Sequence, residues 1–298
     1  ESHPGVSAVV TFQDFPEKSQ RNPSAQNILA NTKALYHGHA VAAVAAKTEQ
    51  IAEEALGLIE VDYEVLPPVM DLDSAMAEGA TLVNENLKTS GLPEPATESS
   101  NIAARQELKI GDIDAGFAEA DVIVEREYST PTVHQGYIEP HACTVRYDEN
   151  GQSMVWCCTQ GHFDVRASTA NLLGMELGKL KVVASEIGGG FGGKTIVYLE
   201  PVALMLSKKS GNPVKIVMDR DEVFKASGPG AATKSWIKIG AKNDGTFTAM
   251  QAKLVFEAGA FPGSPVGPGT MTVFAQFDVK NRILTLPIWK KMSNDLYD

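Results

Sequence analysis

The chain has 298 residues, of which 43% are hydrophobic and 21% are charged, an ordinary composition for a globular protein with a sizeable core and about two domains. Its formal net charge of −11 argues against a surface that neutralises phosphates, so we expect no nucleic-acid partner. The three cysteines, two of them adjacent, fit neither a disulfide framework nor a zinc site and favour a reducing, cytoplasmic compartment. No apolar run reaches the length of a membrane span, so we expect no membrane insertion.

The first 88 residues are predicted to form a small α/β domain. An apolar run at 40–46 is followed by Thr48, a suitable N-cap for an amphipathic helix. The apolar face of this helix would consist of Ile51, Ala55, Leu58 and Ile59. Residues 61–66 alternate apolar and acidic side chains and stop at Pro67, which predicts a half-buried strand.

Residues 89–106 are predicted to be a linker, because the stretch from 84 to 106 is rich in Ser, Thr, Pro, Asn and Glu and lacks apolar periodicity. Beyond it, several short segments have the pattern of strands or helices. Strands are expected at 122–128, 143–148, 153–158 and 181–185, a helix at 164–174, and a further pair of strands around a turn at 243–245. Asn150 and Gly151 predict a hairpin between two of these strands.

The most informative stretch is EIGGGFGGKT at residues 186–195, which lies between a predicted strand and a predicted helix over 195–209. Glycines let backbone N–H groups approach a bound group closely and adopt positive φ at little steric cost. Residues 188–195 also satisfy the phosphate-loop pattern G-x-x-x-x-G-K-[ST]. Two quite different functions therefore compete for the same residues.

In the phosphate-loop interpretation, Lys194 contacts phosphates and Asp219, at the end of an apolar run, binds magnesium. Against it, Pro201 falls inside the helix whose early turns should cradle phosphate, at a cost of roughly 3 kcal/mol or more in a helix interior. In a purely structural interpretation, the glycines form a tight turn and Lys194 is solvated.

Several motifs in a fixed order decide between these interpretations. They are YHGHAVAAVAA with IEVDYEVLPPVMD, GDIDAGFAEADVIVE, YIEPHACTVRYD, WCCTQGHFDVR, IGGGFGGKT and GAFPGSPVGPG. Together they resemble the molybdopterin-binding large subunit of the xanthine dehydrogenase and aldehyde oxidase family of molybdenum hydroxylases. The resemblance implies an α+β fold, with an α/β hammerhead domain over 1–88, an incomplete first molybdopterin-binding domain over 107–285 and a non-matching tail over 286–298.

The resemblance also assigns a site. The implied cofactor-binding residues are Gln160, Gly161, Gly189, Gly190, Phe191 and Gly192. Gln160 matches the family glutamine whose amide hydrogen-bonds a molybdenum oxygen, a donor role that its side-chain NH2 can fill. Glu139 and His141 match a stretch close to the pocket without an assigned role. No protein side chain is implied as a metal ligand, because the pterin dithiolene holds the molybdenum, and the family's base glutamate would lie beyond this chain, so no catalytic residue is assigned.

The implied activity is hydroxylation of an aldehyde or aromatic heterocycle with water as the oxygen source. The implied cofactor is molybdenum-molybdopterin, with its cytosine dinucleotide form left open. An iron–sulfur subunit carrying a 2Fe–2S cluster and an FAD subunit would be partners in a dimer of heterotrimers. Thr195 stands where xanthine-oxidising members have glutamate, and the SGPG at 227–230 lacks their arginine, so purine oxidation is disfavoured.

The end of the sequence departs from the family pattern. The chain reads RILTLPIWKKMSNDLYD where the family continues towards the second half of the cofactor region. We therefore expect a truncated chain that is inactive alone. The alternatives are a phosphate-loop NTPase that uses Gly188 to Thr195 and a non-catalytic assembly fragment.

Overall fold

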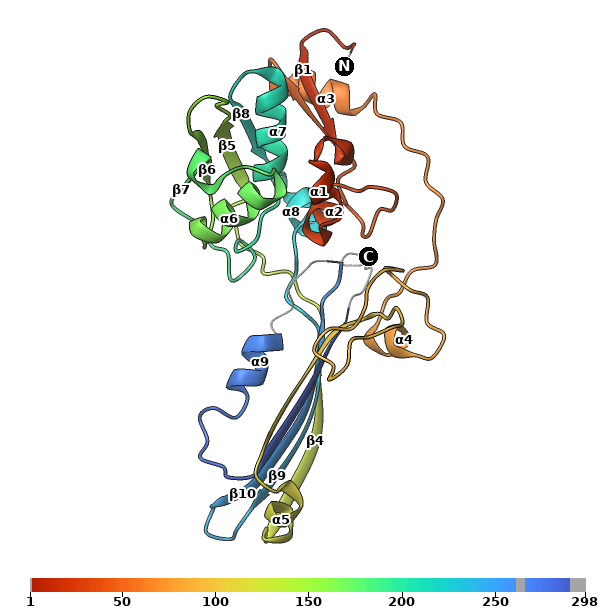
Figure 1. Cartoon of the computed structure of the whole chain (residues 1–298), viewed down its shortest axis with the longest axis vertical. Coiled ribbons are helices and arrows are strands. Elements are labelled where there is room, and N and C mark those ends of the chain that lie inside the picture. The colour runs from red at the N-terminus through yellow and green to blue at the C-terminus, as the bar shows by residue number, and fades with distance from the viewer. Residues whose placement is uncertain (1, 261–265, 290–298) are drawn as a thin grey trace. The chain divides into compact units, whose positions relative to one another are not determined.

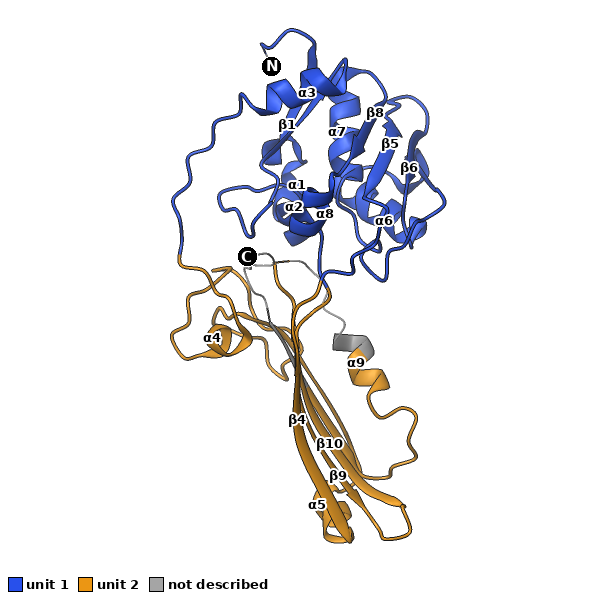
Figure 2. Cartoon of the chain, turned by 180° about the vertical axis from the view of Figure 1, so that it is seen from behind, with its two compact units in different colours: residues 1–66, 134–229, 295–298 blue, residues 67–133, 230–294 orange. Residues whose placement is uncertain are grey.

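The computed structural model describes residues 2–260 and 266–289, with α+β content (Figure 1). The chain forms two compact units that interleave in sequence (Figure 2). Unit 1 contains residues 1–66 and 134–229, and unit 2 contains residues 67–133 and most of the chain after 230. These units divide the chain differently from the predicted linear order of domain, linker and domain, because strand pairing joins segments that are far apart in sequence.

Unit 1 begins with a two-stranded antiparallel sheet of β1 (Val6–Thr11) and β2 (Ala42–Ala46). The predicted cap is confirmed: α3 (Glu49–Leu56) begins after Thr48, whose Oγ1 accepts a hydrogen bond from Ile51 N–H at 3.3 Å. The other short helices of this part are η1 (Phe12–Asp14), α1 (Glu17–Gln20) and α2 (Pro23–Ile28).

A four-stranded sheet completes unit 1, in the order β7-β6-β5-β8. Its strands are β5 (Ala142–Arg146), β6 (Ser153–Cys157), β7 (Leu180–Ala184) and β8 (Val214–Val217). The predicted hairpin is confirmed, since β5 and β6 pair antiparallel. The helices of this part of the chain are α6 (His162–Leu172), η2 (Leu177–Lys179), α7 (Glu200–Ser210) and α8 (Arg220–Ala226).

One apolar core joins both sheets of unit 1. The fully buried side chains of Val10, Val145 and Leu204 belong to the same cluster, which links β1, β5 and α7. Helix α7 packs against β1 and β5, so its side chains are buried nearly all round. The glycine-rich stretch 186–195 precedes this rigid helix.

The predicted helix over 195–209 is wrong at its start. Helix α7 begins only at Glu200, which places Pro201 in its first turn. A proline in the first turn lacks an N–H that would have no partner inside the helix in any case. It is therefore tolerated at the start of the helix and does not break it. Residues 195–199 are consequently part of the loop.

The predicted strand at 61–66 is also wrong. These residues are extended without a strand partner among the described residues, and Val65 is 88% exposed. A segment with alternating apolar and polar residues forms a strand only when a neighbouring strand pairs with it. Here the segment lies exposed on the surface without such a partner among the described residues.

Val65→Ser is accordingly expected to change the free energy of unfolding by less than about 0.5 kcal/mol, because the side chain is already solvated. The matched control is Val145→Ala in β5, where the side chain is fully buried and the expected loss is about 2 kcal/mol. Urea unfolding of the two variants measures both values. A loss of 2 kcal/mol in Val65→Ser would show that 61–66 packs as the sequence predicted.

Unit 2 is built on a five-stranded sheet in the order β3-β11-β10-β9-β4, long and twisted in Figure 1. The strands are β3 (Ile102–Ile110), β4 (Val122–Thr130), β9 (Thr233–Ala241), β10 (Phe247–Glu257) and β11 (Arg282–Trp289). The predicted turn at 243–245 is confirmed, since β9 and β10 pair antiparallel around it. The helices are α4 (Leu72–Met76), α5 (Ile113–Ala118) and α9 (Val266–Thr272).

Two predicted irregular segments contribute to this sheet. Residues 102–106, placed in the linker, are the first half of β3, and residues 286–289, placed in the non-matching tail, are the end of β11. The two segments pair with each other in antiparallel register, Leu286 opposite Gln106. Composition could not reveal a pairing between segments so distant in sequence. The rest of the tail, 290–298, lies outside the described residues.

No helix in the described part of the chain combines the length and the apolar character needed to cross a lipid bilayer.

Candidate functional site

The glycine loop, defined here as residues 186–195, has an unusual backbone. Gly189 and Gly192 adopt φ of +93° and +92°. Phe191 between them has φ +48°, the one positive value at a non-glycine position in the described chain, and its side chain is 75% exposed. Non-glycine residues with positive φ cluster at ligand-binding sites, so this loop is a candidate binding loop.

Two further glycines are required by close packing. A Cβ at Gly190 would lie 2.5 Å from Oε1 of Gln160, and a Cβ at Gly193 would lie 2.7 Å from Cε1 of Tyr137. Real Cβ atoms do not approach other atoms so closely. The loop therefore lies against Gln160 on one side and Tyr137 on the other.

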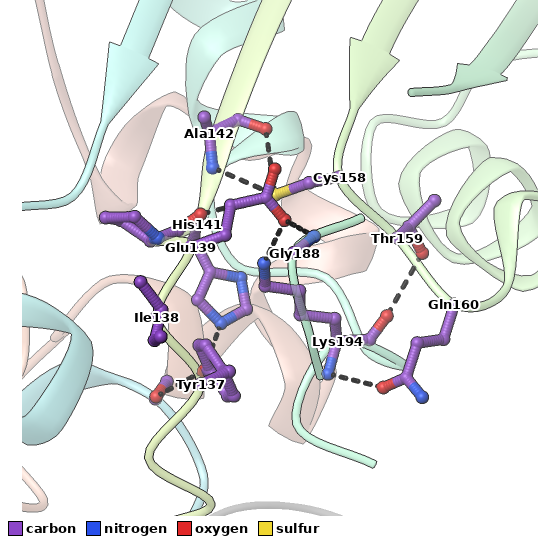
Figure 3. A network of polar contacts seen from close by, with 12 residues as sticks. Tyr137, Ile138, Glu139, His141, Ala142, Cys158, Thr159, Gln160, Gly188 and Lys194 are labelled. Carbon is purple, nitrogen blue, oxygen red and sulfur yellow. Dashed lines mark hydrogen bonds and ion pairs between the residues drawn. The ribbon is translucent and has the colours of Figure 1, made fainter. Parts of the chain in front are cut away.

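Gln160 follows β6 and is fastened to the loop by both its backbone and its side chain (Figure 3). Its backbone N–H donates to the carbonyl of Lys194 at 2.9 Å. Its Oε1 accepts from the N–H groups of Gly192 at 3.0 Å and Lys194 at 3.2 Å. Because both partners are donors, the amide oxygen must face the loop and Nε2 must face away from it.

Several donors remain available at this position. Nε2 of Gln160 has no acceptor among the described residues, and neither have the consecutive backbone N–H groups of Gly189, Gly190 and Phe191. Gly161 differs, since its N–H already donates to Oγ1 of Thr159 at 3.0 Å. The unpaired donors suit an oxygen-rich or anionic ligand.

Lys194, at the end of the loop, is buried and not solvated. Only 1% of the residue is exposed, and its Nζ lies 2.6 Å from Oε2 of Glu139 and 5.0 Å from the ring centre of Tyr137. The same Oε2 accepts from Gly188 N–H at 2.7 Å. Burial raises the pKa of the Glu139 carboxyl, but the hydrogen bonds from Lys194 and Gly188 outweigh it and hold that pKa below its usual value.

This arrangement does not support the phosphate-loop interpretation. The amine of Lys194 is bound to a carboxylate, and α7 begins five residues after Thr195, so the helix that follows the loop in sequence does not start at the loop, as a phosphate loop requires. Asp219, the proposed magnesium ligand, instead caps α8, with its carboxylate accepting from Glu222 N–H at 2.7 Å.

A buried polar cluster lies behind Glu139. The hydroxyl of Tyr137 is 2.6 Å from Nε2 of His141 and 3.2 Å from Oγ of Ser227. His134 accepts from Gly136 N–H through Nδ1, and its Nε2 is 2.9 Å from Oγ of Ser227. Burial lowers the pKa of His141 to about 4, with the charge of Lys194 adding to the effect.

The structure brings together most of the site residues assigned from sequence. Gln160 contacts the loop at Gly190 and Gly192, and Gly189 and Phe191 complete the same turn, whereas Gly161 lies beside them as the N-cap residue of α6. Sequence reasoning missed Tyr137 and Ser227 and left Glu139 without a role. The YIEPH motif was the available signal, but a polar motif does not reveal which loop it contacts.

Comparisons with known proteins fit this geometry. Residues 94–281 match the family model of the molybdopterin cofactor-binding domain. The chain belongs to the molybdenum hydroxylase large-subunit family. Residues 1–67 match the family's a/b hammerhead domain of aldehyde oxidase and xanthine dehydrogenase, which confirms the predicted resemblance and α+β fold class.

Two relatives in this molybdenum hydroxylase family are named for different activities. The probable hypoxanthine oxidase XdhD of Escherichia coli K12 is 35% identical over 305 residues, covering 92% of this chain and 31% of the relative. The nicotinate dehydrogenase large molybdopterin subunit of Eubacterium barkeri is 30% identical and is matched over 60% of its length by 90% of this chain. The chain thus spans about a third of the first relative.

Solved structures of the family superpose well. The CO dehydrogenase of Oligotropha carboxidovorans has a TM-score of 0.81 and 30% identity, covering 99% of this chain and 39% of that one. The aldehyde oxidoreductase of Desulfovibrio gigas has the same TM-score at 24% identity, covering 99% and 33%, and supports the fold. The NTPase and assembly-fragment alternatives gain no support from these comparisons.

Proposed function

We propose that the glycine loop and Gln160 hold molybdenum-molybdopterin in a large subunit that hydroxylates an aldehyde or an aromatic heterocycle with oxygen from water. The observation that carries the proposal is the fixed orientation of Gln160. Two loop N–H groups bind its Oε1, so its Nε2 is left as a donor next to the unpaired N–H groups of the loop.

The residues of the site fit such a cofactor. A molybdenum oxygen and the polar edge of a pterin need donors, which the N–H groups of Gly189, Gly190 and Phe191 supply together with Nε2 of Gln160. The lack of a Cβ at Gly190 makes room for the side chain of Gln160 against the loop. The bound cofactor would supply the redox chemistry, whereas these residues bind it, orient it and hydrogen-bond its oxygens.

The remaining parts of the proposal come from the family. We propose an iron–sulfur subunit with a 2Fe–2S cluster and an FAD subunit as partners in a dimer of heterotrimers, the cytosine dinucleotide as one form of the pterin, and a cytoplasmic location. A relative named as a large subunit supports the partner subunits, and three buried free thiols support the cytoplasmic location. A catalytic base would come from parts of the large subunit that this chain does not span.

The substrate proposal disfavours purines, although one relative is named a probable hypoxanthine oxidase. Thr195 stands in place of the glutamate of xanthine-oxidising members, and its hydroxyl donates to the carbonyl of Gly192 at 2.9 Å. Thr195 therefore fastens the loop instead of presenting a carboxylate. Aldehydes and non-purine heterocycles are the substrates to assay first.

Gln160→Ala is expected to lower the molybdenum content of the chain by about tenfold, because a hydrogen bond to the metal's surroundings is lost. The chain is expressed in a host that makes molybdenum cofactor and analysed by elemental mass spectrometry and by fluorescence of the oxidised pterin. Gln152→Ala is the control, since this exposed glutamine donates to the carbonyl of Gly178 at 2.9 Å and not to the glycine loop. Equal molybdenum in the two variants would contradict the proposal.

A further inference from the structure

The carboxylate of Glu139 binds the glycine loop on both sides of its turn. Oε2 accepts from Gly188 N–H at 2.7 Å, before the turn, and from Lys194 Nζ at 2.6 Å, after it. Figure 3 shows both donors meeting the same carboxylate. The stretch 189–193, which contains the unpaired N–H groups, lies between these two attachments.

Lys194 connects this carboxylate to Gln160. Its Nζ binds Glu139, its N–H donates to Oε1 of Gln160, and its carbonyl accepts from Gln160 N–H at 2.9 Å. A displacement of Lys194 would therefore displace the amide of Gln160 as well. No comparable connection is made by the hydroxyl of Thr195, which bonds within the loop.

The burial of Lys194 makes this connection rigid. Its side chain is 0% exposed, whereas that of Glu139 is 33% exposed. A buried ammonium group without a counter-ion is costly, so the loop cannot leave Glu139 while Lys194 stays buried without leaving that charge unpaired. The ring of Tyr137 lies against the same ammonium and limits its movement further.

We propose that Glu139 and Lys194 are positioning residues. They hold the glycine loop in its hydrogen-bonded conformation in the absence of cofactor, and so orient Gln160 and the loop N–H groups before binding. This inference rests on the proposed function, because it assigns how the same site is preorganised. Binding then does not have to order the loop, which is the usual gain from a preformed site.

The test compares three variants of the full chain, prepared without cofactor and, separately, with it. Glu139→Gln keeps an acceptor for Gly188 N–H but removes the negative charge. Glu139→Gln with Lys194→Met removes both charges and avoids an unpaired buried ammonium. The control is Asp221→Asn with Lys225→Met, which removes an exposed ion pair of α8 of similar length, 2.7 Å.

Hydrogen–deuterium exchange of the cofactor-free chains tests directly whether Glu139 and Lys194 hold the loop in this conformation. Within peptides over 186–195, the hydrogen-bonded amides of Gly188, Gly192 and Lys194 are expected to exchange at least about tenfold faster in both Glu139 variants than in the control, while peptides over β10 in unit 2 stay unchanged. Equal exchange in the loop of all three variants would overturn the proposal whatever the cofactor content.

Molybdenum loading tests the consequence for binding. Both Glu139 variants are expected to hold at least about fivefold less molybdenum than the control, with circular dichroism spectra and melting temperatures that show a folded chain. Faster loop exchange with undiminished molybdenum would overturn the positioning role. Failure of the underlying function would look different, because Gln160→Ala would then also leave the molybdenum content unchanged.

Discussion

Gly190→Ala is expected to reduce the molybdenum content of the chain at least as strongly as Gln160→Ala and to destabilise unit 1. The added Cβ would lie 2.5 Å from Oε1 and 2.8 Å from Cδ of Gln160. The side chain of Gln160 would have to leave the loop, and its two hydrogen bonds to loop N–H groups would break. Losing two hydrogen bonds costs about 1–3 kcal/mol, measured by urea unfolding.

A double variant separates the two consequences of this clash. In Gly190→Ala with Gln160→Ala the obstructing amide is gone, so stability is expected to recover towards that of Gln160→Ala alone while molybdenum stays low. Gly178→Ala is the matched control, because a Cβ there meets no atom within 4 Å. Full molybdenum in Gly190→Ala would show that the loop does not contact the cofactor through Gln160.

The free energy of unfolding is expected to fall by roughly 3 kcal/mol between pH 7 and pH 4 through His141 alone. Burial, together with the nearby charges of Lys194 and His134, lowers the pKa of His141 from 6.5 to about 4, and the charge of Glu139 opposes this only in part. Between these two pKa values His141 is therefore neutral in the folded state and protonated in the unfolded state. The contribution is complete above pH 6.5 and is lost as the pH falls towards about 4.

The comparison with His141→Gln isolates this contribution from other titrating groups. Glutamine keeps an acceptor for the hydroxyl of Tyr137 but does not titrate, so its stability is expected to fall about 3 kcal/mol less than that of the native chain over the same pH range. Urea unfolding at several pH values gives both curves. Parallel curves would mean that folding does not lower the pKa of His141.

Local elements were predictable where the signal is local. The Thr48 cap, the hairpin at Asn150 and Gly151, and the turn at 243–245 each depend on a few adjacent residues, and each is confirmed. The start of α7 was misplaced because Pro201 was taken as an interior residue. Proline does break a helix interior, but it is harmless in a first turn. The error lay in the predicted start of the helix and not in the effect expected of proline.

The pairing of remote segments could not be predicted from sequence. Residues 102–106 have the composition of a linker, and 286–289 fall in a stretch that departs from the family pattern, yet the two pair with each other in one sheet. By contrast, 61–66 has the alternation of a strand and finds no partner in the described chain. Strand formation is decided by the neighbour, which is a property of the tertiary structure.

The sequence by itself determined the family, the glycine loop and Gln160, because these depend on residue types in a fixed order that backbone chemistry requires. Only the tertiary structure decided what Lys194 does. Its motif position suits a phosphate contact or a solvated turn, whereas folding buries its ammonium against Glu139, 55 residues away. A buried charge requires a counter-charge, and the fold can supply it from a segment distant in sequence. The residues next to Lys194 therefore do not predict its partner.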